Sequence, residues 1–233
     1  MKNWLKRTIA SLAPTASQAG QDQWIFGEVF NGMKNGCFVE LGAHDGVTHS
    51  NTYKLERNFQ WRGICVEANP VTFRLLKINR LSKCVNVCLS DKTEKVRFTL
   101  AGEFGQIVPG SQINPPKSDD VLLDAMPLLD VLARENCPPN IDYLSVDLEG
   151  SEDRVLKHFD FDHYCFKTIT IERPSPFLRE LLARKGYILI KDIPCLDAFY
   201  VHESHMKSYT KVMFEHWETK TWWPLIRSLI RGQ

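Results

Sequence analysis

An apolar run that ends in an acid and two glycines constrains this chain more than any other feature. Residues 38–46 read Phe-Val-Glu-Leu-Gly-Ala-His-Asp-Gly, and a second run further along the chain ends at Glu67. In an open α/β sheet, ligands bind outside the carboxyl ends of the strands, and an acid at the end of the second strand is well placed to accept hydrogen bonds from ribose hydroxyls. The two runs therefore predict strands that end at a nucleotide-type cofactor site.

The glycine loop argues against the commoner nucleotide sites. A dinucleotide fingerprint needs GxGxxG, but here only two glycines remain with His44 between them, and the chain has no GxxxxGK[ST] motif. A pyrophosphate would meet Glu40, Asp45 and Glu67, whereas a sulfonium, an amino group and free ribose hydroxyls would find partners in these acids. The loop thus favours S-adenosylmethionine over NAD or ATP. The alternative is a plain strand-to-helix turn in another α/β fold.

Length and periodicity predict one α/β domain. The 233 residues, 43% hydrophobic and 24% charged, suit a single well-packed core. Helices are expected at residues 24–33, 51–59, 70 onward, 128–135, 152–158 and 176–184. Strands are expected at residues 37–41, 63–67, 85–89, 95–100, 143–146, 168–171, 187–191 and 198–201. This alternation predicts a mostly parallel sheet with right-handed crossovers, and the closing pair of strands predicts one antiparallel strand.

Three parts are expected along the chain. An amphipathic segment at 1–20 precedes the domain at 21–205, and a tryptophan-rich tail at 206–233 follows it. Within the domain, the glycine- and proline-rich stretch at 102–120 is long enough to be a lid over the acceptor, or else an insertion without consequence. An aromatic and two amides of the kind that hold a sugar ring lie in it, namely Phe104, Gln106 and Gln112.

Five sequence blocks resemble the FkbM-like methyltransferase family, and the order of elements resembles the seven-stranded class I methyltransferase fold. The blocks are Val39–Gly46, Ser50–Thr52, Val66–Pro70, Leu89–Asp91 and Leu144–Glu152. The resemblance runs from about Gln21 to Glu203. It implies a Rossmann-like α/β fold, S-adenosylmethionine as cofactor, and methyl transfer, usually to oxygen, with glycans and other secondary metabolites among the acceptors.

The same resemblance suggests the cofactor contacts. Glu67 is expected to hold the ribose diol, the small Ala68 to leave room for adenine, and Asp91 to bind the adenine amino group. A surface glutamate at 67 and a turn-forming aspartate at 91 are the structural alternatives. Residues 50–51 offer a hydroxyl and an amide to the cofactor carboxylate, although helix caps would look the same in sequence. The predicted cofactor-binding residues are Glu40, Gly42, Asp45, Ser50, Asn51, Glu67, Ala68, Ser90, Asp91 and Asp147.

Catalysis is expected after the most apolar strand of the second half, at the tip that lies nearest the transferred methyl group in this fold. Asp147 and Glu149 follow that strand, and Glu172 ends the next one. A sugar hydroxyl is a poor nucleophile, so methyl transfer to it needs in-line placement together with a base or a metal. These three acids are the candidate bases, and His44 is a further candidate because an imidazole titrates near pH ~6.5. The alternative for Glu149 is an acid that merely favours a helix start.

No metal is assigned to the chain, although a divalent cation stays open as an alternative. Asp147, Glu149, Glu172 and His202 are expected at the ends of neighbouring strands, and such ligands would suit Mg²⁺ or Mn²⁺. The seven cysteines include no CxxC pair, which argues against zinc and favours buried free thiols in a reducing compartment.

The partners expected are a saccharide or a similar hydroxylated small molecule, and not a nucleic acid, because the net charge is only +1. Tryptophans and basic residues recur in the two terminal segments, which is typical of membrane-surface helices. Packing of these ends on the domain or on a second subunit is favoured over that reading. No apolar run is long enough for a membrane span, and no secretion signal is evident. We therefore expect a cytoplasmic enzyme, with peripheral membrane contact left open.

Two other functions remain to be weighed against the methyltransferase. A noncatalytic α/β module would keep the fold and dock a partner or a membrane through the tail at 206–233. An NAD-dependent enzyme on the same sheet is disfavoured because GxGxxG is missing.

Overall fold

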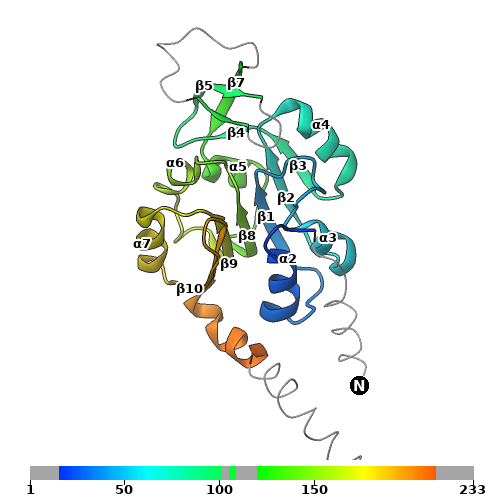
Figure 1. Ribbon diagram of the computed structural model, residues 1–233, viewed down its shortest axis with the longest axis vertical. Helices are drawn as coiled ribbons and strands as arrows, with labels where there is room; N and C mark the ends of the chain where they lie inside the picture. The colour runs from blue at the N-terminus through cyan, green and yellow to red at the C-terminus, as the bar shows by residue number, and fades with distance from the viewer. Residues whose placement is uncertain (1–15, 101–104, 109–119, 214–233) are drawn as a thin grey trace, which may run out of the picture.

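A seven-stranded sheet forms the centre of the computed structural model, which describes residues 16–100, 105–108 and 120–213 (Figure 1). Its strands are β1 (Cys37–Leu41), β2 (Arg62–Glu67), β3 (Lys83–Asn86), β8 (Asn140–Val146), β9 (Cys165–Glu172), β10 (Tyr187–Asp192) and β11 (Asp197–His202). They lie in the order β10-β11-β9-β8-β1-β2-β3. The pairs from β3 to β9 are all parallel, whereas β11 is antiparallel to both of its neighbours. This confirms the predicted class I methyltransferase fold with its closing hairpin.

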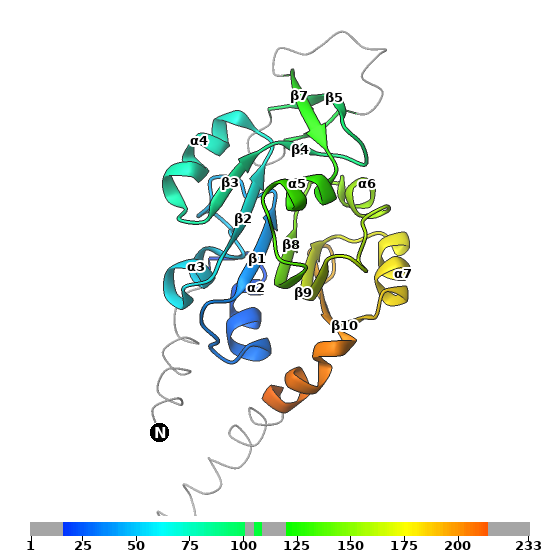
Figure 2. The same ribbon diagram turned by 180° about the vertical axis from the view of Figure 1, so that it is seen from behind.

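Helices cover both faces of this sheet. One layer consists of α2 (Gln21–Gln23), the π-helix η1 (Trp24–Val29), α3 (Tyr53–Phe59) and α4 (Pro70–Asn79), with α2, α3 and α4 seen in Figure 1. The other layer consists of α5 (Leu128–Arg134), α6 (Glu152–Leu156) and α7 (Pro176–Arg184), which Figure 2 shows from behind. Each layer has its own buried cluster, with Leu55 and Leu76 in the first and Leu132 and Leu178 in the second. The sheet is therefore buried on both faces, as its apolar strands require.

Helix α4 begins as the sequence predicts. The side chain of Asn69 accepts a hydrogen bond from the backbone N–H of Val71 at 2.9 Å, and Pro70 occupies the first helical turn. The helix follows directly from the tip of β2, so it fixes the direction in which the chain leaves the sheet.

A second, four-stranded sheet lies beyond the main one and appears at the upper end of Figure 1. It contains β4 (Cys88–Leu89), β5 (Glu94–Thr99), β6 (Gln106–Ile107) and β7 (Asp120–Met126) in the order β4-β7-β5-β6. The prediction of one strand over 85–89 was therefore wrong, because the chain leaves the main sheet after Asn86 and joins the second sheet at Cys88. Strand β7 was not predicted at all. The second sheet has a small core of its own around Val96, Phe98 and Ala125.

The described parts of the terminal segments pack on the domain. A 3-10 turn, η3 (Glu203–His205), leads into a helix at residues 206–213, whose Tyr209 is buried against the cluster beneath η1. The tryptophans of the tail, residues 1–15, Phe104 and Gln112 lie outside the described residues. Over the ranges that the structure describes, no helix is long and apolar enough to cross a bilayer. All seven cysteines are described and free, and Cys195 is exposed, unlike the others.

Candidate active site

A cavity of about 360 Å³ lies at the carboxyl ends of β1, β2, β8 and β9. Both β1 and β8 end there because their parallel register places Leu41 opposite Val146. Most of the residues predicted for the site line this cavity, namely Glu40, Gly42, His44, Ser50, Asn51, Glu67, Ala68, Asp147, Glu149 and Glu172. The sheet thus gathers side chains that are more than 100 residues apart in the sequence.

Gly42 is required where β1 meets the tip of β8. Its φ of +76° lies in the left-handed region, and a Cβ added at this position would lie 1.8 Å from the carbonyl oxygen of Asp147. The backbone N–H of Asp147 in turn donates to the carbonyl of Leu41 at 3.2 Å. A side chain at position 42 would therefore force the two strand tips apart.

Glu67 lies at the tip of β2 and is only 8% exposed. Its carboxylate accepts hydrogen bonds from the backbone N–H groups of His44 at 2.8 Å and Asn69 at 2.7 Å. Burial raises the pKa of this carboxyl. Each oxygen keeps acceptor capacity toward the cavity, because a carboxylate offers about four lone-pair sites and the two backbone bonds use two of them. The reading of Glu67 as a surface glutamate is therefore wrong.

Glu40 lines the cavity, but its carboxylate is held from behind by a buried network. It accepts hydrogen bonds from the Ser50 hydroxyl at 2.9 Å, the Asn51 backbone N–H at 2.9 Å and the Thr52 hydroxyl at 2.7 Å. Arg80 donates to the same carboxylate at 2.8 Å, and both side chains of this ion pair are at most 4% exposed. Glu40 and Ser50 thus shape the loop after β1, and the Ser50 hydroxyl, which was predicted to meet the cofactor carboxylate, donates to Glu40 instead.

Asn51 lines the cavity and carries a buried acceptor that the described protein leaves unused. Its side-chain nitrogen donates to the hydroxyl of Ser145 at 2.8 Å, whereas its Oδ1 is buried without a hydrogen-bond partner among the described residues. A buried oxygen without a donor costs about 1–3 kcal/mol. A ligand that brings an N–H or O–H group to this point would recover that free energy.

The second sheet provides an apolar wall to the same cavity. Val87, Leu89, Phe98 and Ile107 line it, and the first two lie just before and within β4. Gln106, the one described member of the three polar and aromatic residues predicted for a lid, lies beside them. An apolar wall of this kind can pack against the flat ring of a nucleobase.

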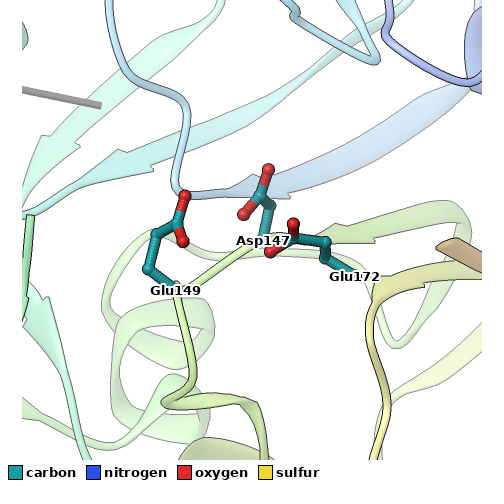
Figure 3. A group of neighbouring side chains, drawn as sticks. All are labelled: Asp147, Glu149 and Glu172. Carbon is teal, nitrogen blue, oxygen red and sulfur yellow. The ribbon is translucent and has the colours of Figure 1, made fainter. Parts of the chain in front are cut away.

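Three carboxylates meet at the open side of the cavity, at the tips of β8 and β9 (Figure 3). Asp147, Glu149 and Glu172 each offer an oxygen within 4.8 Å of the other two. Burial raises the pKa of Asp147 to about 8, and the negative charges of the neighbouring Glu172 and Glu149 add to this effect. A carboxyl with a pKa in this range can exchange its proton near neutral pH.

Arg173 partly neutralises this acidic group. It pairs with Glu172 at 2.8 Å and with Glu149 at 3.2 Å. Burial raises the pKa of Glu149, and the negative charge of Glu172 adds to this effect. The three carboxylates are also a set that can hold a divalent cation, since oxygen ligands in such proximity suit Mg²⁺ or Mn²⁺.

Backbone strain is concentrated around this cavity. Nine described residues other than glycine have a positive φ, and the five that line the cavity are His44, His49, Glu149, Arg173 and Cys195. Such conformations cost about 1–3 kcal/mol each and persist where the surrounding structure enforces them, most often at functional sites. This strain favours a functional role for the loops after β1, β8 and β9 over a role as ordinary turns.

Four predicted residues are placed elsewhere. Asp45 accepts hydrogen bonds from Val47 and Thr48 and so closes the turn after the glycine loop. Ser90 donates to Asp91, whose pKa is lowered mainly by a hydrogen bond from Lys157, with Arg154 also bound to it. These three side chains are not among those that line the cavity. The fourth, His202, ends β11 and bonds to Ser204.

His202 was expected beside the acids because it ends a strand, but β11 is antiparallel and so its first residue, not its last, lies at that edge. Asp197 is paired with Glu172 in the register of β11 and β9. Burial and Glu172 raise the pKa of Asp197 to about 6. Sequence reasoning also missed Arg173 and Ser145, which carry no motif of their own and follow only from the register of the sheet.

The fold and the site define the class of this protein. A class I sheet, an acid at the tip of β2 beside an apolar wall, and carboxylates at the tips of β8 and β9 are the parts of a methyltransferase. Residues 40–189 match the family model described as the methyltransferase FkbM domain, which is more than half of the chain. The chain belongs to this family. No curated protein matches it significantly.

Solved structures with a similar arrangement have low sequence identity to the chain. The METTL16 MTase domain is 13% identical, with a TM-score of 0.47 over 82% of this chain and 68% of that one. Methyltransferase FkbM from Methylobacillus flagellatus KT is 14% identical, with a TM-score of 0.43 over 72% of this chain and 44% of that one. M. capricolum TrmK, bound to S-adenosyl-homocysteine, is 12% identical, with a TM-score of 0.40 over 80% and 68%. Likenesses this distant do not identify an acceptor.

S-adenosylmethionine is the cofactor that this family membership implies, and the cavity fits it. Glu67 offers acceptors to a ribose diol, and the apolar wall can cover an adenine ring. The acids around the cavity also suit a positively charged sulfur. The residues present therefore fit the ribose, the adenine and the sulfonium of the group.

Proposed function

We propose that the protein is an S-adenosylmethionine-dependent O-methyltransferase that acts on a hydroxyl of a saccharide or a similar polyhydroxylated metabolite. The observation that carries the proposal is the buried carboxyl of Asp147, which lines the same cavity as Glu67 and has a pKa of about 8. A hydroxyl must lose its proton as it is methylated, and a base works best when its pKa lies near the working pH.

The cofactor is held, in this proposal, by groups on three strand tips. Glu67 binds the ribose hydroxyls, and Ala68 leaves space for the adenine against Val87 and Leu89. Asn51, which lines the cavity in the loop after β1, lies beside the methionine part of the cofactor. Bound in this way, the cofactor supplies an electrophilic methyl group on a sulfonium.

The acceptor is held by the three acids at the open side of the cavity. Glu149 and Glu172 accept hydrogen bonds from neighbouring hydroxyls of the acceptor, while Arg173 limits the repulsion between them. Asp147 takes the proton of the hydroxyl that is methylated. A polyhydroxylated molecule suits this arrangement because each of its hydroxyls can donate to a carboxylate oxygen.

Alignment of the acceptor is expected to contribute more than proton removal. In-line placement contributes up to about 7–11 kcal/mol, whereas a positioned base contributes typically ~10²–10⁴-fold in rate. Loss of the base alone should therefore leave a slow but measurable enzyme. Loss of the pocket shape should remove activity altogether.

Binding of S-adenosylhomocysteine, measured by calorimetry, is the first test. We expect micromolar binding by the full chain, a loss of at least ~1 kcal/mol in Glu67→Ala, and no binding of NAD. Glu180→Ala is the matched control, because this glutamate lies on α7 and pairs with Arg184 at the surface. Equal affinities of the Glu67 variant and the control would contradict the cofactor assignment.

Turnover on a panel of saccharide acceptors is the second test. Asp147→Asn is expected to reduce kcat by ~10²–10⁴-fold with cofactor affinity little changed. If S-adenosylhomocysteine does not bind even at millimolar concentration, the noncatalytic alternative gains support. In that case deletion of residues 206–233, and not Glu67→Ala, should abolish function.

A further inference from the structure

Helix α4 exposes a row of aliphatic side chains to solvent. Val71, Leu75 and Ile78 are 56%, 50% and 79% exposed, and Leu81, just after the helix, is 77% exposed. Spacings of four and three residues place Val71, Leu75 and Ile78 along one side of the helix, and we call these three residues together with Leu81 the α4 stripe. The opposite side of α4, with Thr72 and Leu76, is buried against the sheet. The helix is therefore already packed, and the α4 stripe is surplus to that packing.

Two basic residues flank the α4 stripe. Arg74 and Lys77 are both exposed, and neither forms an ion pair with a carboxylate of the described residues. No acidic residue occurs in the sequence from Ala68 to Ser90. The surface thus combines apolar area with uncompensated positive charge. Isolated exposed leucines are common, but four aliphatic side chains in one row beside two cations are an interaction surface.

We propose that the α4 stripe, together with Arg74 and Lys77, docks the protein on an anionic lipid bilayer. An amphipathic helix that binds a bilayer surface places aliphatic side chains at the acyl boundary and basic side chains among the headgroups. Anionic lipids attract each basic residue near the surface. Both components are present on α4, on a helix that the fold holds rigid.

Other occupants fit this surface less well. A nucleic acid would call for aromatic side chains that stack on bases, and the α4 stripe is entirely aliphatic. A second copy related by two-fold symmetry would bring the same patch against itself, so Arg74 and Lys77 would face their own positive charges. A lipid surface satisfies the charge and the apolar area at once.

The position of α4 gives the docking a consequence for the site. Ala68 lines the cavity, and the helix starts two residues later at Pro70. A bilayer in contact with the α4 stripe would therefore approach the cavity only at Val71, because the stripe runs from there toward Leu81 and the amino end of β3. The inference does not rest on the proposed function, and it does not involve the terminal segments at 1–15 and 214–233.

Sedimentation of the full chain with vesicles tests the proposal. We expect binding to vesicles of phosphatidylcholine mixed with phosphatidylserine, and at least about tenfold weaker binding to phosphatidylcholine alone. The double variants Leu75→Glu/Ile78→Glu and Arg74→Gln/Lys77→Gln should each weaken binding to the mixed vesicles by about tenfold or more. The control Leu122→Glu/Phe177→Glu changes two apolar side chains that are 67% and 43% exposed on other elements, and it should bind as the unchanged protein does.

Three results would overturn the proposal. The first is undiminished vesicle binding by the Leu75→Glu/Ile78→Glu variant with an unchanged thermal unfolding midpoint. The second is a dimer in gel filtration that this variant converts to a monomer, which would assign the α4 stripe to a second copy. The third is a loss of RNA binding, and not of vesicle binding, in the Arg74→Gln/Lys77→Gln variant.

Discussion

Replacement of Arg80 by methionine should destabilise the fold far more than a typical surface substitution. Arg80 is 5% exposed and donates to Glu40 at 2.8 Å, to Glu56 at 3.2 Å and to the Thr52 hydroxyl at 2.7 Å. It is thus one buried cation shared by two buried carboxylates. Burial alone would lower the pKa of Arg80, but the two glutamates hold it above its ordinary value.

The expected loss follows from what the variant leaves behind. Removal of one partner of a buried ion pair costs about 3–5 kcal/mol, because the other charge stays buried without compensation. Both glutamates keep other donors, such as Ser82 for Glu56 at 2.8 Å, so we expect the value to stay within that range and not to exceed it. At a urea m-value of about 2 kcal/mol/M, the unfolding midpoint should fall by roughly 1.5–2.5 M.

Urea unfolding, followed by tryptophan fluorescence, measures this effect. Arg184→Met is the matched control, since Arg184 pairs with Glu180 at the surface of α7 and such a pair is worth only about 0.3–0.5 kcal/mol. The deficit of Arg80→Met should shrink toward pH 5, because the stranded carboxylates can then take up protons. A loss no larger than that of Arg184→Met at pH 8 would refute the reasoning.

Three further predictions concern the cavity. Gly42→Ala should lower the free energy of unfolding by well over the ~1–2 kcal/mol that a left-handed conformation costs. Gly20 has a φ of +78° with nothing within 4 Å of an added Cβ, so Gly20→Ala should lower it by no more than that. Chemical unfolding measures both values. The value of kcat/KM should rise with pH through about 8 as Asp147 loses its proton, and Glu172→Gln should move that profile to lower pH because a neighbouring negative charge is removed. Turnover should survive EDTA, since the ion pairs of Arg173 with Glu149 and Glu172 already reduce the repulsion among the three acids; a loss that Mn²⁺ restores would instead assign the three acids as metal ligands.

The pH dependence of stability has a defined sign at this site. The pKa of Asp147 in the folded protein, about 8, lies above the ordinary value of 3.8 for an aspartate. The unfolded chain therefore loses the Asp147 proton at a lower pH than the folded protein does. As pH rises from about 4 to about 8, this carboxyl lowers the free energy of unfolding progressively. Asp147→Asn should accordingly be more stable than the unchanged protein at pH 9, even though it turns over slowly.

Much of the main sheet could be predicted because its strands are short, apolar and bounded by clear signals. The strand at 37–41 was predicted with its observed bounds, and the start of α4 followed from Asn69 and Pro70. The break after Asn86 was missed, since Asn86 is the only polar residue among the apolar side chains of residues 85–89, which contribute to two different sheets. The periodicity of apolar residues indicates that a segment is buried, but it does not indicate which of two sheets the segment joins.

The sequence predicted those site residues correctly that lie at the end of a strand, because the strand end fixes their place at the cavity. Glu67 and Asp147 lie in the cavity for that reason. Asp91 was assigned by resemblance alone, and the structure instead gives it to Lys157 and Arg154, partners that come from a later helix and its end. The choice of His202 over Asp197 failed on strand direction, although the antiparallel strand itself had been predicted. The direction of a strand decides which of its end residues lies at the cavity edge of the sheet, so it has to be considered for each residue separately.

The separate pairing of the second sheet divides the cavity between two independently built parts. Its strands pair with one another, and in the described residues its pairing does not extend into the main sheet. The groups proposed to carry out the reaction come from the main sheet, whereas Phe98 and Ile107 come from this appended unit. Sequence change in residues 88–107 can therefore reshape one side of the binding space while the reacting edge stays as it is. Exchange of that unit between homologues is a direct route to enzymes with altered selectivity.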